Sequence, residues 1–225
     1  MKIFKLLLVT GLAIALSACK DGLPSIAGYK MFHVPSGNYK AGQVFAIYSK
    51  PKKINIIHNT TLLSGDYLES RSADFSAEEV KSLDLYIKGV IQKELDARLG
   101  VKASNYINIK YTNTMVVDAV HTKVFSRIKA DLDSDPSAKA YIKSLVTKKA
   151  VKLDVATSIL TADVKVTIKD DVEAGLDLDV PKLLDILEAG FGPSLDSDRS
   201  VVGKQLAIGF HADPHIISLL VEEFR

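Results

Sequence analysis

The stretch ADVKVTIKDDVEAGLDLDV, residues 162–180, carries the strongest structural signal in this sequence of 225 residues. Every even position except Asp170 is apolar, and every odd position is polar, charged or glycine. Because successive side chains of a β-strand point to opposite faces, this alternation predicts extended chain with one wet and one dry face. Lys169, Asp170 and Asp171 predict a turn in the middle, which would fold the stretch into a hairpin.

Other parts of the chain also alternate or are rich in β-forming residues. The same alternation occurs just upstream, at Val151, Leu153, Val155 and Ile159. Further strands are predicted at 43–49, 54–58, 106–111 and 115–125, the last two as a strand pair. Residues 20–43 are rich in Gly, Pro and Ser and predict a tether that leads into the first strand.

The clearest helix is predicted between Ser76 and Gly100. Ser76 and Glu79 have the spacing of a capping box, an apolar stripe follows at helical spacing, and Gly100 ends it. Shorter helices are predicted where a proline stands at the first turn, at 136–146, 181–190 and 213–225. The predicted fold class is α+β, one domain with a twisted, mostly antiparallel sheet, a long central helix and short peripheral helices.

The first residues read as a targeting signal. Lys2 and Lys5 give a positive start, and an apolar run from Leu6 to Leu16 is too short to span a bilayer. The small residue Ala18 precedes Cys19, the only cysteine, in a pattern that resembles the lipobox of bacterial lipoproteins. The resemblance implies a signal peptide at 1–18, cleavage between Ala18 and Cys19, and lipidation of Cys19. An ordinary signal peptide with a chance cysteine is the alternative.

Composition excludes several classes of protein. A single cysteine rules out an internal disulfide framework and a cysteine-based metal cluster. Lys2 and Lys5 of the leader account for the formal net charge of +2 of the whole chain. The rest of the chain holds 27 basic and 27 acidic side chains. Because the rest of the chain is formally neutral, its charge does not favour binding to nucleic acid.

No catalytic motif is present, so the sequence predicts a protein that is not an enzyme. His211 and His215 have ligand-like spacing, but Pro214 between them prevents one helix from aligning them, and we expect a strand-end and a helix-start histidine instead. The acidic clusters at 131–135 and 196–198 lack the glycine and terminal glutamate of a calcium loop. We predict no metal site and no cofactor.

Several local motifs, in colinear order from 19 to 212, resemble those of bacterial gasdermins, relatives of the animal pore-forming proteins. They are Gly28–Met31 with Pro35, Ser70–Asp74, Leu99–Val101, Ile107–Tyr111, Leu176–Pro181 and Gly203–Ala212. Cys19 stands where that family carries its lipid-modified cysteine.

The resemblance implies a sheet like that of the gasdermin N-terminal domain, which can change from its resting form to a membrane-inserted form. Members of the family rest as monomers held closed by a short C-terminal peptide. A protease removes the peptide, and hairpins then extend, insert and oligomerise into a β-barrel pore. The expected partners are a lipid bilayer, further copies of the chain and an activating protease.

The chain departs from that family in two respects. Family members act in defence from the cytoplasm, whereas this leader directs export. The lipid would then be a lipoprotein anchor rather than a reversible palmitoyl thioester, in the bacterial envelope and facing the periplasm, with Lys20 favouring the outer membrane. The tail after the last strand, 213–225, is short and serves either as an inhibitory helix or as the last helix of a static fold.

Together these observations predict a lipidated tether and first segment at 19–43, a gasdermin-like domain at 44–212 and a tail at 213–225. A transmembrane β-strand needs about 9–11 alternating residues. The candidate membrane-inserting hairpin is therefore assigned to Val151, Leu153, Val155, Ile159, Val164, Val166, Ile168, Leu176, Leu178 and Val180. A soluble half-buried sheet shows the same pattern, and a static envelope lipoprotein that binds a partner is the alternative function.

Overall fold

The upstream and downstream alternating stretches form a single strand, β7 (Val151–Ile168), which is the longest strand of the sheet. The computed structural model describes residues 23–49, 52–99, 107–148, 151–169, 195–197 and 200–223. The second half of the predicted hairpin, from Asp170 to Val180, and the helix predicted at 181–190 lie outside these residues. The turn between the two halves is therefore a prediction that stays open.

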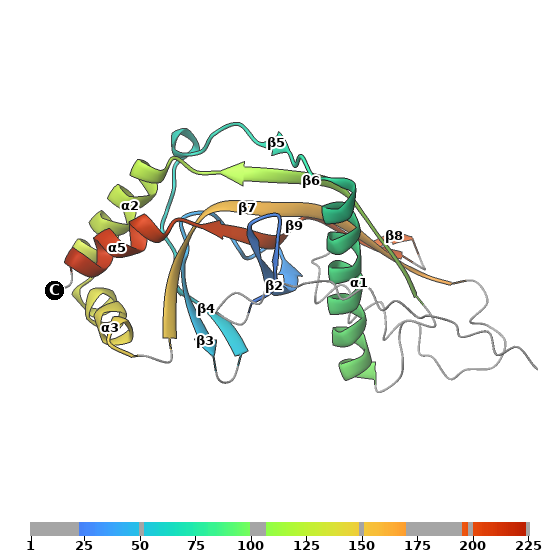
Figure 1. The fold of residues 1–225 in the computed structure, drawn as a ribbon, viewed down its shortest axis with the longest axis horizontal. Helices are drawn as coiled ribbons and strands as arrows, with labels where there is room; N and C mark the ends of the chain where they lie inside the picture. The colour runs from blue at the N-terminus through green and yellow to red at the C-terminus, as the bar shows by residue number, and fades with distance from the viewer. Residues whose placement is uncertain are drawn as a thin grey trace, which may run out of the picture.

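Every strand pairing is antiparallel, and β7 is the strand that joins the two halves of the sheet. The main path runs β1-β2-β9-β7-β3-β4. Its strands are β1 (Ser25–Ile26), β2 (Tyr29–Ser36), β3 (Val44–Ser49), β4 (Lys52–His58) and β9 (Ser200–Ala212). Off this path lie β5 (Arg71–Ser72), β6 (Ile107–Asp118) and β8 (Leu195–Ser197). Figure 1 shows how strongly β7 curls along its length.

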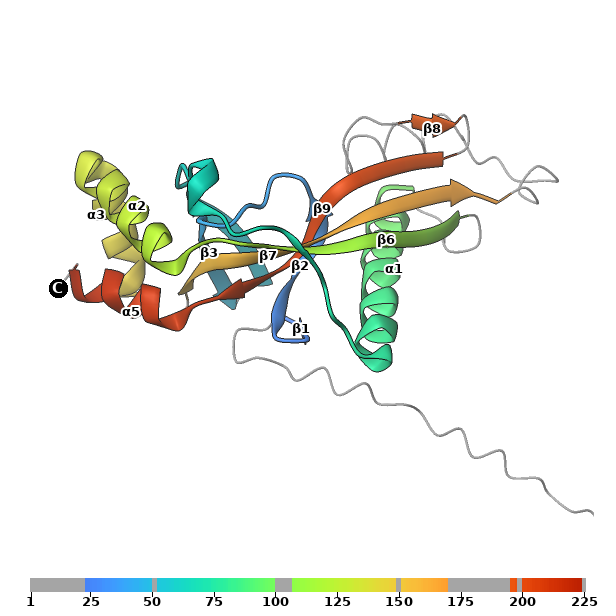
Figure 2. The same cartoon turned by 90° about the horizontal axis from the view of Figure 1, so that it is seen from above.

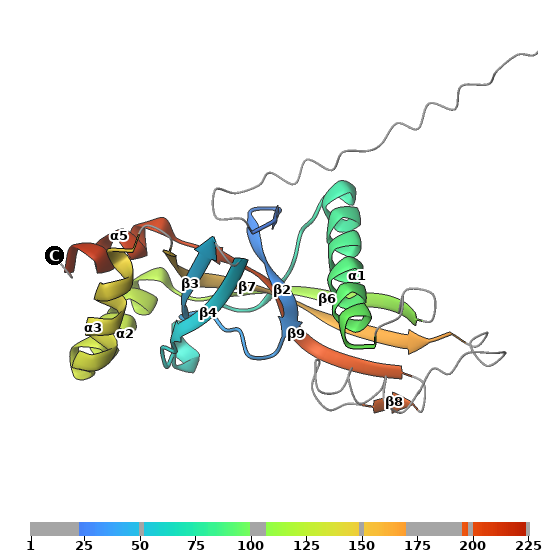
Figure 3. The ribbon, with the colours of Figure 1, turned by 90° about the horizontal axis from the view of Figure 1, so that it is seen from below.

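In the part of the chain that the structure describes, four α-helices lie toward opposite ends of this sheet. They are α1 (Ala77–Leu99), α2 (His121–Ser134), α3 (Pro136–Val146) and α5 (Pro214–Glu223). Seen from above, α2, α3 and α5 gather at one end of β7 and α1 lies near the other (Figure 2). Seen from below, β3 and β4 lie between the two groups (Figure 3). The α+β class, the curled antiparallel sheet and the long helix are confirmed.

Two of the predicted helix starts, at Ser76 and at Asp135, are confirmed at the level of individual hydrogen bonds. The Ser76 N–H donates to the Glu79 carboxylate at 2.9 Å, and the Glu79 N–H donates to the Ser76 hydroxyl at 3.3 Å. Asp135 accepts from the N–H groups of Ser137 and Ala138, both at 3.0 Å, just before Pro136 opens α3. These caps satisfy amides that a helix leaves without internal partners.

The predicted strand pair at 106–111 and 115–125 is wrong. Residues 107–118 form one strand, β6, because residues 112–114 make a bulge rather than a turn, with Asn113 at a φ of 51°. Residues 121–125 belong to α2, in which Val124, Ile128 and Leu132 recur every fourth residue and are buried. That stripe is helical in period, and it outweighs the β-forming residues that precede it.

The tether predicted for 20–43 is also wrong for the part that the structure describes. Ala27 and Gly28, both with positive φ, turn β1 into β2 in a two-residue hairpin that pairs Ile26 with Tyr29. Met31 and Phe32 are completely buried, and β2 pairs with β9 inside the sheet. Burial of apolar residues here outweighs the loop-like composition around them.

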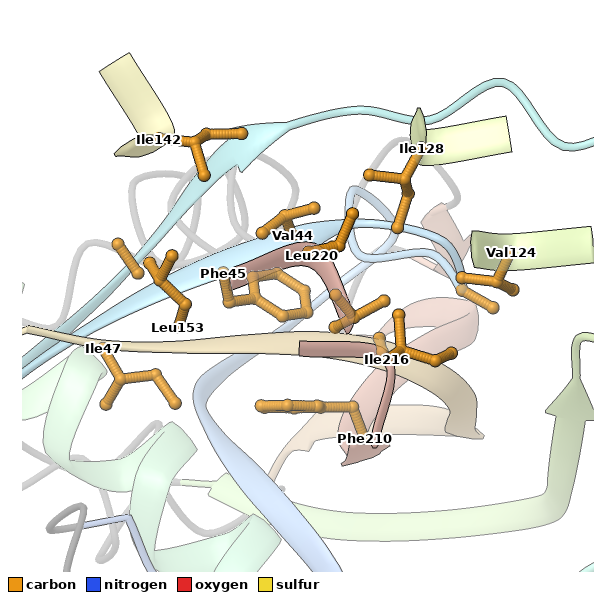
Figure 4. Close-up of a cluster of buried hydrophobic side chains, with 14 of the residues drawn as sticks. Val44, Phe45, Ile47, Val124, Ile128, Ile142, Leu153, Phe210, Ile216 and Leu220 are labelled. Carbon is orange, nitrogen blue, oxygen red and sulfur yellow. The ribbon is translucent and has the colours of Figure 1, made fainter. Parts of the chain in front are cut away.

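Two hydrophobic clusters hold the fold, one at each end of β7. The helical-end cluster packs α2, α3 and α5 on β3, β7 and β9, with Phe45, Phe210, Ile216 and Leu220 among its members (Figure 4). The α1 cluster packs Leu83, Ile87, Ile91 and Leu95 of α1 on β6, β7 and β9. Every described helix is attached to the sheet through one of these two clusters.

A buried ion pair crosses the bend of the sheet. The Lys30 ammonium on β2 lies 2.5 Å from the Asp154 carboxylate on β7, and their side chains are only 15% and 6% exposed. By register, Lys30 is aligned through Phe210 with Ile159, five residues further along β7 than Asp154. The contact therefore depends on the curl of β7, which carries its first residues back toward β2.

Replacing Asp154 with Asn leaves the Lys30 ammonium without this carboxylate in a largely water-free place. We expect the free energy of unfolding to fall by about 3–5 kcal/mol, measured by urea denaturation. The double variant Lys30→Met, Asp154→Leu removes both charges and should recover most of that loss. A single variant as stable as the wild type would contradict a structural role for the pair.

Candidate functional site

The structure places seven of the ten residues of the predicted inserting hairpin on β7. Leu176, Leu178 and Val180 lie outside the described residues, as do Ala18 and Cys19 of the predicted lipidation signal. The seven fall into two groups that the structure separates. Val151, Leu153, Val155 and Ile159 pack in or against the helical-end cluster, and Val164, Val166 and Ile168 belong to the α1 cluster.

The two groups occupy opposite faces of β7, because the first has odd and the second even positions. The expectation of one wet and one dry face fails over the first half, since residues 153–162 are all buried. Four of these are polar, namely Asp154, Thr157, Ser158 and Thr161. The first half of β7 is therefore an interior strand and not an amphipathic one.

The second half of β7 is amphipathic together with its two neighbours. Residues in register across β6, β7 and β9 share a face: Ile109, Val166 and Val201 form one buried row. The next row, Lys110, Lys165 and Val202, contains two exposed lysines and a partly exposed valine. Alternation is thus repeated across three adjacent strands, and these rows form the candidate site.

One helix, α1, covers the apolar face of these rows. Leu83, Ile87, Ile91 and Leu95 are buried against it at helical spacing. Two tyrosine hydroxyls secure the helix: Tyr86 donates to the Phe32 carbonyl at 2.6 Å, and Tyr111 of β6 donates to the Val80 carbonyl at 2.9 Å. Burial raises the pKa of Tyr86 far above its ordinary value, so this hydroxyl stays protonated as a donor.

Asp163 holds the two strands that flank β7 at their irregular points. Its carboxylate accepts from the Asn113 side-chain amide at 2.7 Å and from the Gln205 backbone N–H at 2.8 Å. Asn113 and Gln205 both have a positive φ, and the register of β6 and of β9 against β7 shifts beside them. Each bulge adds a residue, so the apolar side chains that follow return to the face of α1.

Sequence reasoning missed Asp163, although a signal for it was present. In β6 the residues of the α1 cluster are odd-numbered before the bulge, at Ile107 and Ile109, and even-numbered after it, at Val116. In β9 they change in the same way, from odd-numbered Val201 to even-numbered Leu206 and Ile208. A change of parity inside a strand indicates a bulge. The carboxylate between two such changes was recognisable only once the strands were paired.

At the other end of the sheet, α5 is attached at both of its ends and through its middle. Asp213 accepts from the His215 N–H at 2.8 Å and lies 2.8 Å from Nδ1 of His121 on α2. The Lys129 ammonium donates to Glu223 at 2.6 Å. Ile216 and Leu220 are buried in the helical-end cluster between these contacts. The tail predicted from 213 is therefore a docked helix.

The structure offers little for catalysis among the described residues. His211 ends β9 and His215 begins α5, as expected from sequence, and no group of three or more His, Cys, Asp or Glu side chains there could hold a metal ion. Two hollows, of about 440 and 430 Å³, are lined mainly by aromatic, aliphatic, amide and hydroxyl side chains. Neither hollow contains an acid or a histidine in its lining.

Among the described helices, none combines the length and the apolar character that crossing a bilayer requires.

Replacing Asp163 with Ala removes the acceptor for two donors at the paired bulges. A hydrogen bond to a charged acceptor contributes about 1.5–3 kcal/mol, and we expect a loss in that range in urea denaturation. Lys204→Ala, next to Gln205 on the exposed face, is the matched control and should change stability by about 0.5 kcal/mol or less. Equal effects of the two substitutions would refute the role of Asp163.

The attachment of α5 should weaken in acid. Burial opposes ionisation of Asp213, but the His215 N–H and the His121 ring outweigh it and hold the pKa of this carboxyl below its ordinary value. Because the folded pKa is the lower one, the stabilisation is complete above about pH 4 and is lost as the pH falls through the folded pKa.

Amide resonances of α5, followed by NMR from pH 6 downward, should report this loss. Asp213→Ala should weaken α5 already at pH 6, whereas Glu222→Ala, on the exposed side of the same helix, should leave the wild-type pH response intact. An α5 that stays attached at pH 6 in the Asp213→Ala variant would contradict the assignment.

Comparison with protein-family models finds no match for this chain. Comparison with curated proteins finds no match either.

Proposed function

We propose that this protein is a membrane-anchored, gasdermin-like pore former, tethered through Cys19 and activated by loss of its C-terminal helix. The observation that carries the proposal is the amphipathic set of rows on β6, β7 and β9. On β7 every even position from Leu160 to Ile168 is apolar and buried, a span of nine residues, although the polar Thr161 within it is buried as well. A transmembrane β-strand needs about 9–11 residues with this alternation.

The energetics of α1 explain why such a sheet would stay closed in water. Exposing a buried Leu or Ile costs about 1.5–3 kcal/mol, so uncovering Leu83, Ile87, Ile91 and Leu95 together costs about 6–12 kcal/mol. This is comparable with the whole stability of a typical domain, about 5–15 kcal/mol. Displacement of α1 becomes favourable only where lipid chains take the place of its apolar side chains on the sheet.

The position of α5 supports a role for the tail as a restraint. Phe210 and Ile208 are neighbours on β9, yet Phe210 packs in the helical-end cluster with α5 and Ile208 packs in the α1 cluster. Loss of α5 removes Ile216 and Leu220 from the first cluster. In the proposed mechanism the exposed strands then loosen, and the change passes along β7 and β9 to the rows that α1 covers.

The alternative is a static envelope lipoprotein that binds a partner protein. One observation favours it: both faces of β7 are buried over residues 153–162, and the Lys30–Asp154 pair crosses the bend. A strand held in this way is suited to a permanent fold. This alternative predicts a stable monomer that unfolds or precipitates when α5 is lost.

The two functions differ in what happens after the tail is cut. A specific protease site inserted between Ala212 and Asp213 permits cleavage of the otherwise complete chain. We expect dye release from liposomes only after cleavage, and rings in negative-stain images of the same sample. The uncleaved protein with the same insertion is the control, and circular dichroism without liposomes separates conversion from unfolding. Liposomes that stay intact after complete cleavage would contradict pore formation.

A further inference from the structure

We propose that the end of the sheet formed by β3, β4 and the start of β7 docks end-on against an anionic lipid surface. The inference concerns a surface remote from the candidate site, and it rests on the proposed function only in placing the protein at a membrane. Figure 1 shows the end of β3, the start of β4 and the start of β7 on the same side of the molecule.

Strand register brings the lysines of these two connections together. Tyr48 near the end of β3 pairs with Lys53 of β4 on one side and with Val151 of β7 on the other. Since neighbouring strands lie about 4.8 Å apart, Lys53 and Val151 are separated by about 10 Å. The Val151 N–H donates to the carbonyl of Lys148 at 3.1 Å, which brings Lys148 to the same place. We call Lys53, Lys148 and Lys152 the lysine tip.

The lysine tip concentrates positive charge in a chain that is formally neutral beyond its leader. Residues 49–53 and 147–152 together contain six lysines and no acidic residue. Asp154 is two residues from Lys152, with 3.9 Å between their charged atoms, but its side chain is 6% exposed and it also pairs with Lys30. Lys53, Lys148 and Lys152 are all exposed. Lys143, in the last turn of α3, adds a further exposed cation nearby.

The placement of the lysines on two faces favours a planar partner. Lys53 pairs with Tyr48, and Lys152 pairs with Ile47, so their side chains leave opposite faces of the sheet. A flat surface that meets the strand ends reaches both, whereas a peptide or a nucleic-acid strand lying along one face reaches only one of them. Tyr48 is partly buried between them, and a tyrosine beside lysines is typical of a membrane–water interface.

The test measures binding and not leakage, so that it is independent of pore formation. The full chain carrying Cys19→Ser, which removes the predicted lipid anchor, is sedimented with phosphatidylcholine vesicles with and without phosphatidylglycerol. We expect binding only with phosphatidylglycerol and weakening at high salt. Each lysine near an anionic surface contributes about fivefold, so the triple variant Lys53→Gln, Lys148→Gln, Lys152→Gln should bind about 100-fold more weakly.

A matched control changes the net charge by the same amount elsewhere. Lys81→Gln, Lys93→Gln and Lys123→Gln replace three exposed lysines on α1 and α2 and should leave vesicle binding within about twofold of wild type. Equal weakening by the two triple variants would overturn the proposal, as would binding that ignores phosphatidylglycerol. Tighter, tip-dependent binding of a single-stranded oligonucleotide than of vesicles would also overturn it. Loss of dye release with vesicle binding intact would instead count against the proposed function alone.

Discussion

Strand β7 gives more buried apolar side chains to the two hydrophobic clusters than any other described strand, although β2 and β9 also contribute to both. Its first half gives odd-numbered side chains to the cluster under α2, α3 and α5, and its second half gives even-numbered ones to the cluster under α1. Between Ile159 and Leu160 the burial passes from one face to the other without a break.

The flanking strands β6 and β9 must therefore stay in register with β7 where it bends. A regular ladder cannot do so, because strand twist accumulates along a long pair. The bulges at Asn113 and Gln205 absorb the mismatch, and Asp163 between them satisfies an amide on each side. At the other end of the bend the Lys30–Asp154 pair links β2 to β7, which are not neighbours in the strand order. Polar contacts thus connect the strands at both ends of the bend.

Local features of the sequence predicted three of the four described α-helices, α1, α3 and α5, but missed α2, and they predicted the sheet only in outline. The capping box at Ser76 and the Asp135–Pro136 pair mark helix starts through bonds to residues two or three positions away, so a short window suffices. The bulge at 112–114 was taken for a turn, because an interrupted alternation has the same local signature in both cases. The two faces of β7 were not separated, since which face is buried at each point depends on α1 and α5, which lie far away in sequence.

The order of strand pairing has a consequence for biosynthesis. β2 pairs locally with β1 and β3 pairs locally with β4, but the second partner of β2 is β9 and that of β3 is β7, so each of these early strands gains its second partner late. Lys30 and Asp154 are 124 residues apart. Such non-local pairing is slow. Early strands with one unpaired edge are prone to aggregate until the late strands have been made. One edge of β2 therefore stays without its partner until residues 200–212 have emerged from the ribosome.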